Sequence, residues 1–429
     1  MPEAESQKKV FDIVEKLAKD GCVAAAATPG YGCAAYSIFS MCIGNKLGAK
    51  LENICEEKLF VPAYGSFILE ISDNADIEAQ IKETADTDGE SFEFEVIGTV
   101  TDEYELSVKT ENGEEKIDLT AIQEAWESSI EDVFPYRKAG EKVEAISYPK
   151  QGRRKCASLL TGAKPRVVIP VFPGNNCEFD TARAFALAGA ETDTFVINNL
   201  TAETVAQSVN TLAKKINESQ IVMIPGGFSG GDEPDGSAKF IAAFFRAPQI
   251  TEAVRDLINN RDGLMLGICN GFQALIKLGL VPFGDIIPAD ENSPTLTFNT
   301  IGRHQSRLIN TRISSTKSAW LAKTQVGDIH TVAISHGEGR FVANDETLKS
   351  LIANGQVAAQ YTDEFGVPSM DWNVNPNGSA AAIEAITSPD GRILGKMGHS
   401  ERSGQNLYRN VPGNMHQPIF EAGVEYFTA

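Results

Sequence analysis

A cysteine lies at the centre of the segment Gly267-Ile268-Cys269-Asn270-Gly271, where an apolar run meets a helical pattern. The run over 263–266 is typical of a buried strand, and residues 272–278 carry apolar side chains at helical spacing. Small residues beside Cys269 permit the sharp strand-to-helix turn of a nucleophile elbow, and the helix start favours a thiolate. The motif therefore predicts a nucleophilic cysteine, with a buried and inert thiol as the alternative.

A catalytic cysteine needs a base for its proton and a third group that orients the base. The chain has five histidines, and one of them, His399, stands two positions before Glu401 at the end of a predicted strand. Side chains two positions apart in an extended chain face the same side, so the carboxylate can orient the imidazole. The alternative is a surface pair without a role.

Backbone N–H groups can supply the oxyanion hole that acyl transfer requires. The candidates are Gly227 or Phe228, which follow a strand pattern over 220–224, together with Asn270 directly after the cysteine. Ligand sites in parallel sheets lie at the carboxyl ends of the strands, where all these residues fall. We therefore expect thiol-based acyl transfer at this edge of a sheet.

Residues 165–429 alternate strand and helix patterns, which predicts an α/β domain with a parallel sheet and right-handed crossovers. Its later part is richer in strands, with a hairpin expected around Ser388-Pro389-Asp390-Gly391. The expected strands cover 166–172, 192–198, 220–224, 330–335, 357–361, 381–387 and 392–397, and the expected helices cover 180–187, 203–216, 238–245, 250–258 and 272–278.

Residues 1–135 predict a smaller α+β domain without a catalytic cluster of its own. Gly30-Tyr31-Gly32 precedes a helical pattern, and such a turn either receives a phosphate or is only a turn. The expected elements are a helix over 6–19 with Ser6 as N-cap, a helix over 34–46, strands over 66–71 and 92–96, a hairpin of 104–109 and 115–119 around Asn112-Gly113, and a helix reaching Val133 that a capping box of Thr120 and Gln123 opens.

Residues 136–164 carry eight Lys or Arg against two Glu, inside a chain whose net charge is -20. We predict a solvated basic linker here. The alternative is a basic strap that docks on an acidic domain or helps to hold an anionic substrate. The expected division of the chain is thus 1–135, a linker over 136–164, and 165–429.

Composition excludes several classes of protein. The net charge of -20 opposes nonspecific binding to nucleic acid or to anionic membranes. Seven cysteines without a C-x-x-C pair predict neither a disulfide framework nor a metal site, and they fit a reducing cytoplasm. The absence of an 18-residue apolar run and the polar start of the chain predict a soluble protein.

Several short motifs are shared with a known family. In residues 165–429 they are Phe172-Pro173-Gly174-Asn175-Asn176-Cys177, Pro225-Gly226-Gly227, 267–273, Ser335-His336-Gly337-Glu338-Gly339-Arg340, Asn375-Pro376-Asn377-Gly378-Ser379 and Gly398-His399-Ser400-Glu401-Arg402, and in the first part they are 30–32, 44–48 and 59–65. The motifs of residues 165–429 resemble class I (triad) glutamine amidotransferases, and more specifically the phosphoribosylformylglycinamidine synthases of purine biosynthesis. Residues 1–160 are similar, more loosely, to the C-terminal subdomain of aminoimidazole ribonucleotide synthetase-like enzymes, which forms part of the synthetase half.

The resemblance implies a class I glutaminase domain, a flavodoxin-like open and mainly parallel sheet. It implies that Cys269 attacks the side-chain amide of glutamine and forms a γ-glutamyl thioester, while His399 and Glu401 handle the protons. The family's ammonia then serves the ATP-dependent amidation of formylglycinamide ribonucleotide. The residues implied to seat glutamine are Gly226, Gln273, Ser335, His336 and Gly337.

Two features depart from the family pattern. Gly398 and Ser400 flank His399, where related glutaminases often carry proline. Nothing in the sequence resembles the ATP-binding half of the synthetase, so ATP and Mg²⁺ are implied for a missing synthetase part, as a longer chain or a partner subunit, and no cofactor is expected here. The alternatives are an inactive glutaminase-like scaffold that binds a synthetase partner and a redox-sensing cysteine, which leaves His399 and Glu401 without a role.

Overall fold

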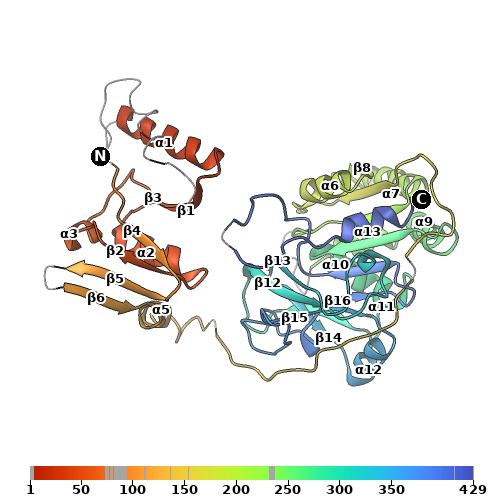
Figure 1. Cartoon of the computed structure of the whole chain (residues 1–429). Coiled ribbons are helices and arrows are strands. Elements are labelled where there is room, and N and C mark those ends of the chain that lie inside the picture. Colours follow the sequence, from red (N-terminus) through yellow and green to blue (C-terminus); the bar gives the residue numbers. More distant parts are fainter. Residues whose placement is uncertain are drawn as a thin grey trace. The chain divides into compact units, whose positions relative to one another are not determined.

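The computed structural model describes residues 4–72, 77, 81, 94–110, 113–135, 137–152, 154–230, 237–409 and 411–428. It divides the chain into two compact units (Figure 1). The smaller unit comprises Met1–Phe134 with Gln405–Pro412, and the larger comprises Pro135–Gly404 with Gly413–Ala429. Among the described helices, none is both long and apolar enough to cross a membrane.

The smaller unit contains two sheets and short helices. Strands β4 (Gly98–Thr101), β2 (Gly48–Leu51), β5 (Glu105–Thr110) and β6 (Gly113–Asp118) form one sheet in that order, and β1 (Val23–Ala27) pairs antiparallel with β3 (Ile68–Ile71). The helices are α1 (Ala4–Lys19), α2 (Cys33–Ile43), α3 (Glu56–Leu59) and α5 (Leu119–Ser128). Ile13 and Leu17 of α1 pack with Cys22 and Val23, because residues four apart share one helix face.

Several local predictions for this unit were wrong. Ser6 lies inside α1 instead of capping it. The side chain of Asp118 caps α5 by accepting from the Thr120 N–H, whereas Gln123 of the expected capping box accepts from the Tyr104 hydroxyl at 2.8 Å. That helix ends at Ser128, before the predicted Val133.

The expected strand over 92–96 was also misplaced. Residues 92 and 93 lie outside the described part of the chain, residues 94–96 are irregular, and β4 begins only at Gly98. Phe94 and Val96 are exposed, so their alternation with polar residues did not mark a buried face. The hairpin is confirmed, because β5 and β6 pair antiparallel, although Asn112 of its turn lies outside the described residues.

A nine-stranded mixed sheet forms the centre of the larger unit, in the order β13-β12-β15-β16-β17-β10-β9-β7-β8 (Figure 1). Strands β17, β10, β9, β7 and β8 are parallel to one another, as predicted, and the remaining neighbouring pairs, from β13 to β17, are antiparallel. The strands are β7 (Arg166–Val171), β8 (Glu191–Val196), β9 (Ile221–Ile224), β10 (Leu264–Ile268), β12 (Gln305–Ile313), β13 (Ile329–His336), β15 (Val357–Thr362), β16 (Ile383–Thr387) and β17 (Ile393–Lys396).

Helices cover this sheet and share one large apolar core with it. Strand β10 is buried at every position, as its continuous apolar sequence requires for a central strand. A separate pair, β11 (Thr295–Phe298) and β14 (Glu338–Val342), is antiparallel. The helices are α6 (Glu178–Leu187), α7 (Ala202–Glu218), α8 (Lys239–Phe245), α9 (Pro248–Asn259), α10 (Asn270–Leu278), α11 (Leu280–Phe283), α12 (Asp345–Ala353) and α13 (Ile419–Glu425), with short 3-10 turns η1 (Ala319–Leu321) and η2 (Ala380–Ala382).

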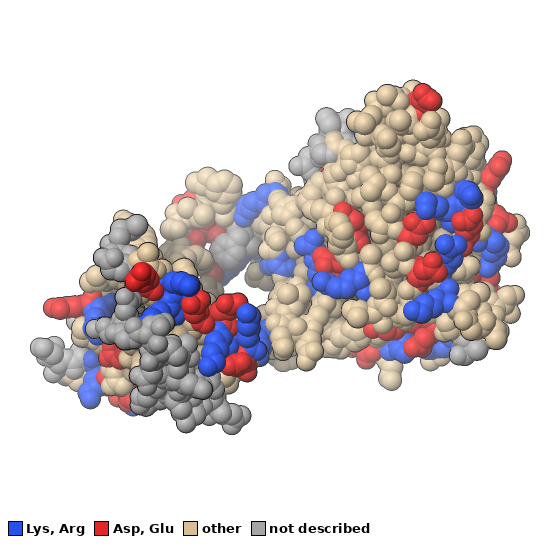
Figure 2. All heavy atoms as spheres, turned by 90° about the horizontal axis from the view of Figure 1, so that it is seen from above, with Lys and Arg blue, Asp and Glu red and all other residues tan. Residues whose placement is uncertain are grey.

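The basic segment predicted as a linker is irregular along most of its described length and belongs to the larger unit. It makes isolated bridges through Lys142 to Ser369, Tyr148 to Ser315 and Leu160 to Thr428. Ile146 is buried, and its N–H donates to Gln360 Oε1 at 2.7 Å. Across the face of the larger unit in Figure 2, basic side chains lie among acidic ones.

Candidate active site

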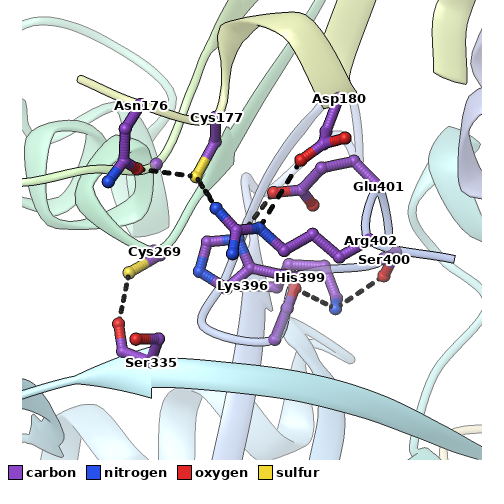
Figure 3. Close-up of polar contacts among 12 residues, drawn as sticks. Asn176, Cys177, Asp180, Cys269, Ser335, Lys396, His399, Ser400, Glu401 and Arg402 are labelled. Carbon is purple, nitrogen blue, oxygen red and sulfur yellow. Dashed lines mark hydrogen bonds and ion pairs between the residues drawn. The ribbon is translucent and has the colours of Figure 1, made fainter. Parts of the chain in front are cut away.

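Four neighbouring parallel strands deliver the candidate residues to one edge of the sheet. His399 follows β17, Cys269 follows β10, Gly226 follows β9, and Cys177 lies beyond the end of β7. The carboxyl ends of parallel strands meet at the same edge, which explains why residues far apart in sequence converge there. Figure 3 shows Cys177, Cys269 and His399 grouped at this edge.

Cys269 has the strained backbone of a nucleophile elbow. Its φ of 53° and ψ of -107° lie outside the regions that L-residues prefer, and the residue stands directly before α10. Two glycines make the turn possible: a Cβ on Gly271 would lie 1.9 Å from the Ile224 carbonyl oxygen, and one on Gly267 would lie 2.6 Å from the Gly271 backbone. Cys269 is 4% exposed, and its thiol donates to the Ser335 carbonyl oxygen at 3.7 Å.

His399 and Glu401 form a buried pair. Their Nδ1 and Oε1 atoms lie 2.5 Å apart, and the residues are 4% and 2% exposed. The peptide N–H of His399 donates to the Ala333 carbonyl oxygen at 2.8 Å, so strand β13 holds the backbone of this residue. The structure thus brings together the predicted nucleophile, base and orienting carboxylate.

The electrostatics of the site favour a charged imidazole. Burial by itself lowers the pKa of His399, but the carboxylate of Glu401 and the thiol groups of Cys269 and Cys177 outweigh it, and the pKa is raised well above its ordinary value. Burial likewise raises the pKa of Glu401, and the charge and hydrogen bond of His399 overcome this and lower it. Imidazolium and carboxylate therefore stabilise each other.

Of the predicted oxyanion donors, Phe228 is already engaged. Its N–H donates to the Gly174 carbonyl oxygen at 2.8 Å, so in this conformation Phe228 cannot also receive an oxyanion. Gly227 has a φ of 138°, and Asn270 is the first residue of α10, where backbone N–H groups lack an intrahelical acceptor. Gly227 and Asn270 remain the candidate donors.

The residues expected to seat glutamine have different environments. The Gln273 side-chain amide is held internally: it donates to the Glu338 carbonyl oxygen and accepts from Asn270 Nδ2 at 2.9 Å. His336 is buried, and burial lowers its pKa to about 3, so its ring is neutral. A Cβ on Gly337 would meet no atom within 4 Å, whereas the Ser335 hydroxyl lies 2.9 Å from His304 Nε2.

Two residues near the base were given no role by the sequence. Cys177 Sγ lies 3.9 Å from His399 Nδ1, and Arg402 Nη2 donates to this sulfur at 3.3 Å (Figure 3). Donor atoms of Cys177, His399 and Glu401 lie within 4.8 Å of one another, a spacing that suits a metal ion. The Arg402 cation beside the sulfur opposes a second cation there. The position of Cys177 after a parallel strand was the signal that could have identified it.

The comparisons with known proteins define the class. The family described as CobB/CobQ-like glutamine amidotransferase domains matches residues 164–427, and the chain belongs to this family.

Two of the similar proteins are PurQ subunits. The PurQ subunit of phosphoribosylformylglycinamidine synthase from Methanococcus maripaludis is 37% identical over 56% of this chain and 82% of its own length. The PurQ subunit from Aquifex aeolicus is 32% identical over 58% of this chain and 96% of its own length. A solved structure of PurLQS from Thermotoga maritima aligns with 62% of this chain and 99% of its own, at 24% identity and a TM-score of 0.44.

Replacing Glu401 tests the electrostatic arrangement. Glu401→Gln removes the carboxylate that contributes most to raising the pKa of His399, so less opposes the lowering effect of burial and this pKa falls. A raised histidine pKa stabilises the fold at low pH, and this stabilisation is lost as the pH rises through the folded-state value. In the variant we expect the stabilisation of the fold to be lost at a lower pH than in the parent. NMR titration of the His399 ring measures the pKa, and melting temperature against pH measures the stabilisation.

Glu421→Gln is the matched control. Its partner His416 is exposed, with Nε2 3.2 Å from Glu421 Oε1, so the His399 titration should keep its midpoint. An unchanged His399 pKa in Glu401→Gln would contradict the arrangement. Because the orienting carboxylate is lost, glutamine hydrolysis should also fall by roughly 10²-fold or more.

Proposed function

We propose that this chain is the glutaminase component of a phosphoribosylformylglycinamidine synthase and acts in purine biosynthesis. A single observation carries the proposal. Cys269, on its strained elbow, and the buried pair of His399 and Glu401 follow the ends of two adjacent parallel strands. The kinship with PurQ subunits supports the pathway assignment.

The first half of the reaction forms a thioester. The thiolate of Cys269 attacks the side-chain carbonyl carbon of glutamine, and the carbonyl oxygen becomes an oxyanion that the N–H groups of Gly227 and Asn270 stabilise. The C–N bond then breaks as the His399 imidazolium gives its proton to the leaving nitrogen. Ammonia departs, and the γ-glutamyl group remains on the sulfur.

The second half hydrolyses the thioester. Neutral His399 removes a proton from water, the resulting hydroxide attacks the thioester carbonyl, and the C–S bond breaks to give glutamate and the Cys269 thiolate. Glu401 keeps Nδ1 of His399 hydrogen-bonded throughout, so that Nε2 serves both proton transfers. The site returns to its starting charge state.

The glutamine seat would lie where β9 and β13 end and α10 begins. Gly226, Ser335 and Gly337 would contribute backbone, and the open space beside Gly337 leaves room for a substrate. Gln273 and His336 would support the glutamine site without contacting solvent, since both are buried and Gln273 is hydrogen-bonded to Asn270 and Glu338.

The ammonia would be used by a synthetase partner, which binds ATP and Mg²⁺ and amidates formylglycinamide ribonucleotide. The relatives are named as subunits, which agrees with a divided enzyme. We propose the division 1–135, 136–164 and 165–429, with the first part serving the synthetase side. Seven free cysteines suit a reducing cytoplasm as the place of the reaction.

The test is glutamate release from glutamine by this chain, alone and with a synthetase partner, ATP and formylglycinamide ribonucleotide. We expect release by the chain alone and formation of the amidine only when all components are present. No release under either condition would contradict the proposal and favour an inactive scaffold that binds the synthetase.

A further inference from the structure

We propose that Lys396 and Glu384 form a buried clamp that positions the base His399, an inference that rests on the proposed function. Lys396 is the last residue of β17, and Glu384 lies on the antiparallel neighbour β16. Their side chains are 2% and 0% exposed, and Nζ lies 3.4 Å from Oε1. The pair is thus an ion pair sealed from solvent next to the candidate active site.

The clamp holds both neighbours of His399 in the chain. Lys396 Nζ donates to the Gly398 carbonyl oxygen at 2.6 Å and to Ser400 Oγ at 2.9 Å (Figure 3). Glu384 Oε1 accepts from the Gly398 N–H at 2.7 Å. Three hydrogen bonds from one ion pair therefore fix the backbone before His399 and the side chain after it.

The segment has further support on its outer side. Ser400 Oγ, which accepts from Lys396, donates in turn to Gln417 Oε1 at 2.6 Å. The His399 N–H is already bound to the Ala333 carbonyl oxygen. Residues 398–400 are consequently held at each position, so the backbone from which the imidazole extends toward Glu401 is fixed.

Gly398 fits the same arrangement. A Cβ at this position would lie 3.0 Å from Glu384 Oε1, 3.1 Å from Lys396 Nζ and 2.6 Å from Val332 Cγ2. Any larger residue would push against the clamp, and proline would also remove the N–H that Glu384 accepts. The clamp and Val332 therefore leave room only for glycine before the base.

Burying two charges is costly, and an apolar pair of similar volume would often serve stability as well. Lys396 ends a strand whose other residues are Ile393, Leu394 and Gly395, so an apolar residue would suit the core there. The charged pair has a use that an apolar pair lacks, because it supplies directed hydrogen bonds to residues 398 and 400. Displacing a catalytic group by about 1 Å can cost roughly 10²-fold in rate.

Two substitutions at one position separate hydrogen bonding from charge. Glu384→Gln and Glu384→Met remove the same charge, but only Gln keeps an oxygen that accepts from the Gly398 N–H. We expect Glu384→Gln to keep kcat for glutamine hydrolysis within about threefold of the parent, and Glu384→Met to lose about tenfold or more, with KM for glutamine changed less than twofold. Equal kcat values in the two variants, or a loss confined to KM, would overturn the proposal.

The lysine side has its own variant and control. Lys396→Met should lose about tenfold or more in kcat with little change in KM, because both of its donated bonds disappear. Lys215→Met is the matched control, since this lysine pairs with Asp193 at 2.6 Å, is only partly buried and belongs to α7. If Lys396→Met and Glu384→Met do not melt cooperatively, Ser400→Ala tests the clamp in their place, because it removes the acceptor of one lysine bond. A threefold fall in kcat supports the clamp, and an unchanged kcat overturns it.

A second measurement does not depend on turnover. The rate at which iodoacetamide alkylates Cys269, followed by mass spectrometry of its peptide, reports how well His399 supports the thiolate. This rate should fall in Glu384→Met and stay near the parental value in Glu384→Gln, and equal rates would overturn the clamp. A parent chain that releases no glutamate would instead contradict the proposed function and leave the alkylation result to judge the clamp.

Discussion

Cys269→Ala should abolish glutamate release from glutamine, with a loss of about 10⁴-fold or more in kcat. Without the sulfur no γ-glutamyl thioester can form, and the remaining site supplies only binding and oxyanion contacts. The fold should survive, because Ala keeps the Cβ of this 4% exposed residue and removes only the sulfur atom. Glutamate release and the melting temperature, measured on the same preparation, check both parts.

Cys55→Ala is the control for this prediction. Cys55 is the exposed cysteine of the smaller unit, and its replacement should leave glutamate release unchanged. An electrophilic glutamine analogue should label Cys269 in the parent and label no residue in Cys269→Ala. Persistent hydrolysis in Cys269→Ala would refute the role of this cysteine.

Gly226→Ala should reduce kcat by roughly 10²-fold, although the substitution adds only one methyl group. A Cβ on Gly226 would lie 2.7 Å from His399 Cε1, 3.1 Å from Cys177 Sγ and 3.5 Å from Cys269 Cβ. His399 cannot move without weakening its bond to Glu401, because the pair is buried. The imidazole must therefore lose alignment with the thiol, with the carboxylate, or with both.

The measurement is kcat and KM for glutamine together with the melting temperature. Gly404→Ala is the matched control, since a Cβ there would meet no atom within 4 Å. We expect parental kinetics from the control and a fall in kcat from Gly226→Ala. Full activity in Gly226→Ala would show that the base tolerates displacement and would contradict a catalytic role for the close packing of Gly226 against His399.

The sequence alone was sufficient to predict the parallel strands and the residues at their ends. The apolar run before Gly267, the glycines beside Cys269 and the turn at 388–391 are local signals, because each depends on backbone conformation within a few residues. The structure has these elements within a few residues of the predicted bounds. His399 and Glu401 could be paired for the same reason, since they lie two positions apart.

Local signals failed where side chains had competing partners. Asp118, two residues before the expected Thr120, took the N-cap position of α5, and Gln123 bound Tyr104 instead of the helix end. Phe228 has the right place for an oxyanion donor, but Gly174 from a different loop accepts its N–H. Which hydrogen-bond partner a group takes depends on atoms distant in sequence, so a short sequence pattern cannot predict it.

The tertiary structure alone decided what surrounds the base. β13 and β8 are the two edge strands of the sheet. The carbonyl groups of Ala333 and Ser335 in β13 nevertheless accept hydrogen bonds from the His399 N–H and the Cys269 thiol. Lys396 and Glu384 appear in the sequence only as charges within two apolar strands. Their pairing depends on the register of β16 against β17, which long-range contacts set. The sequence thus identified the candidate reacting groups, whereas their alignment required the folded sheet.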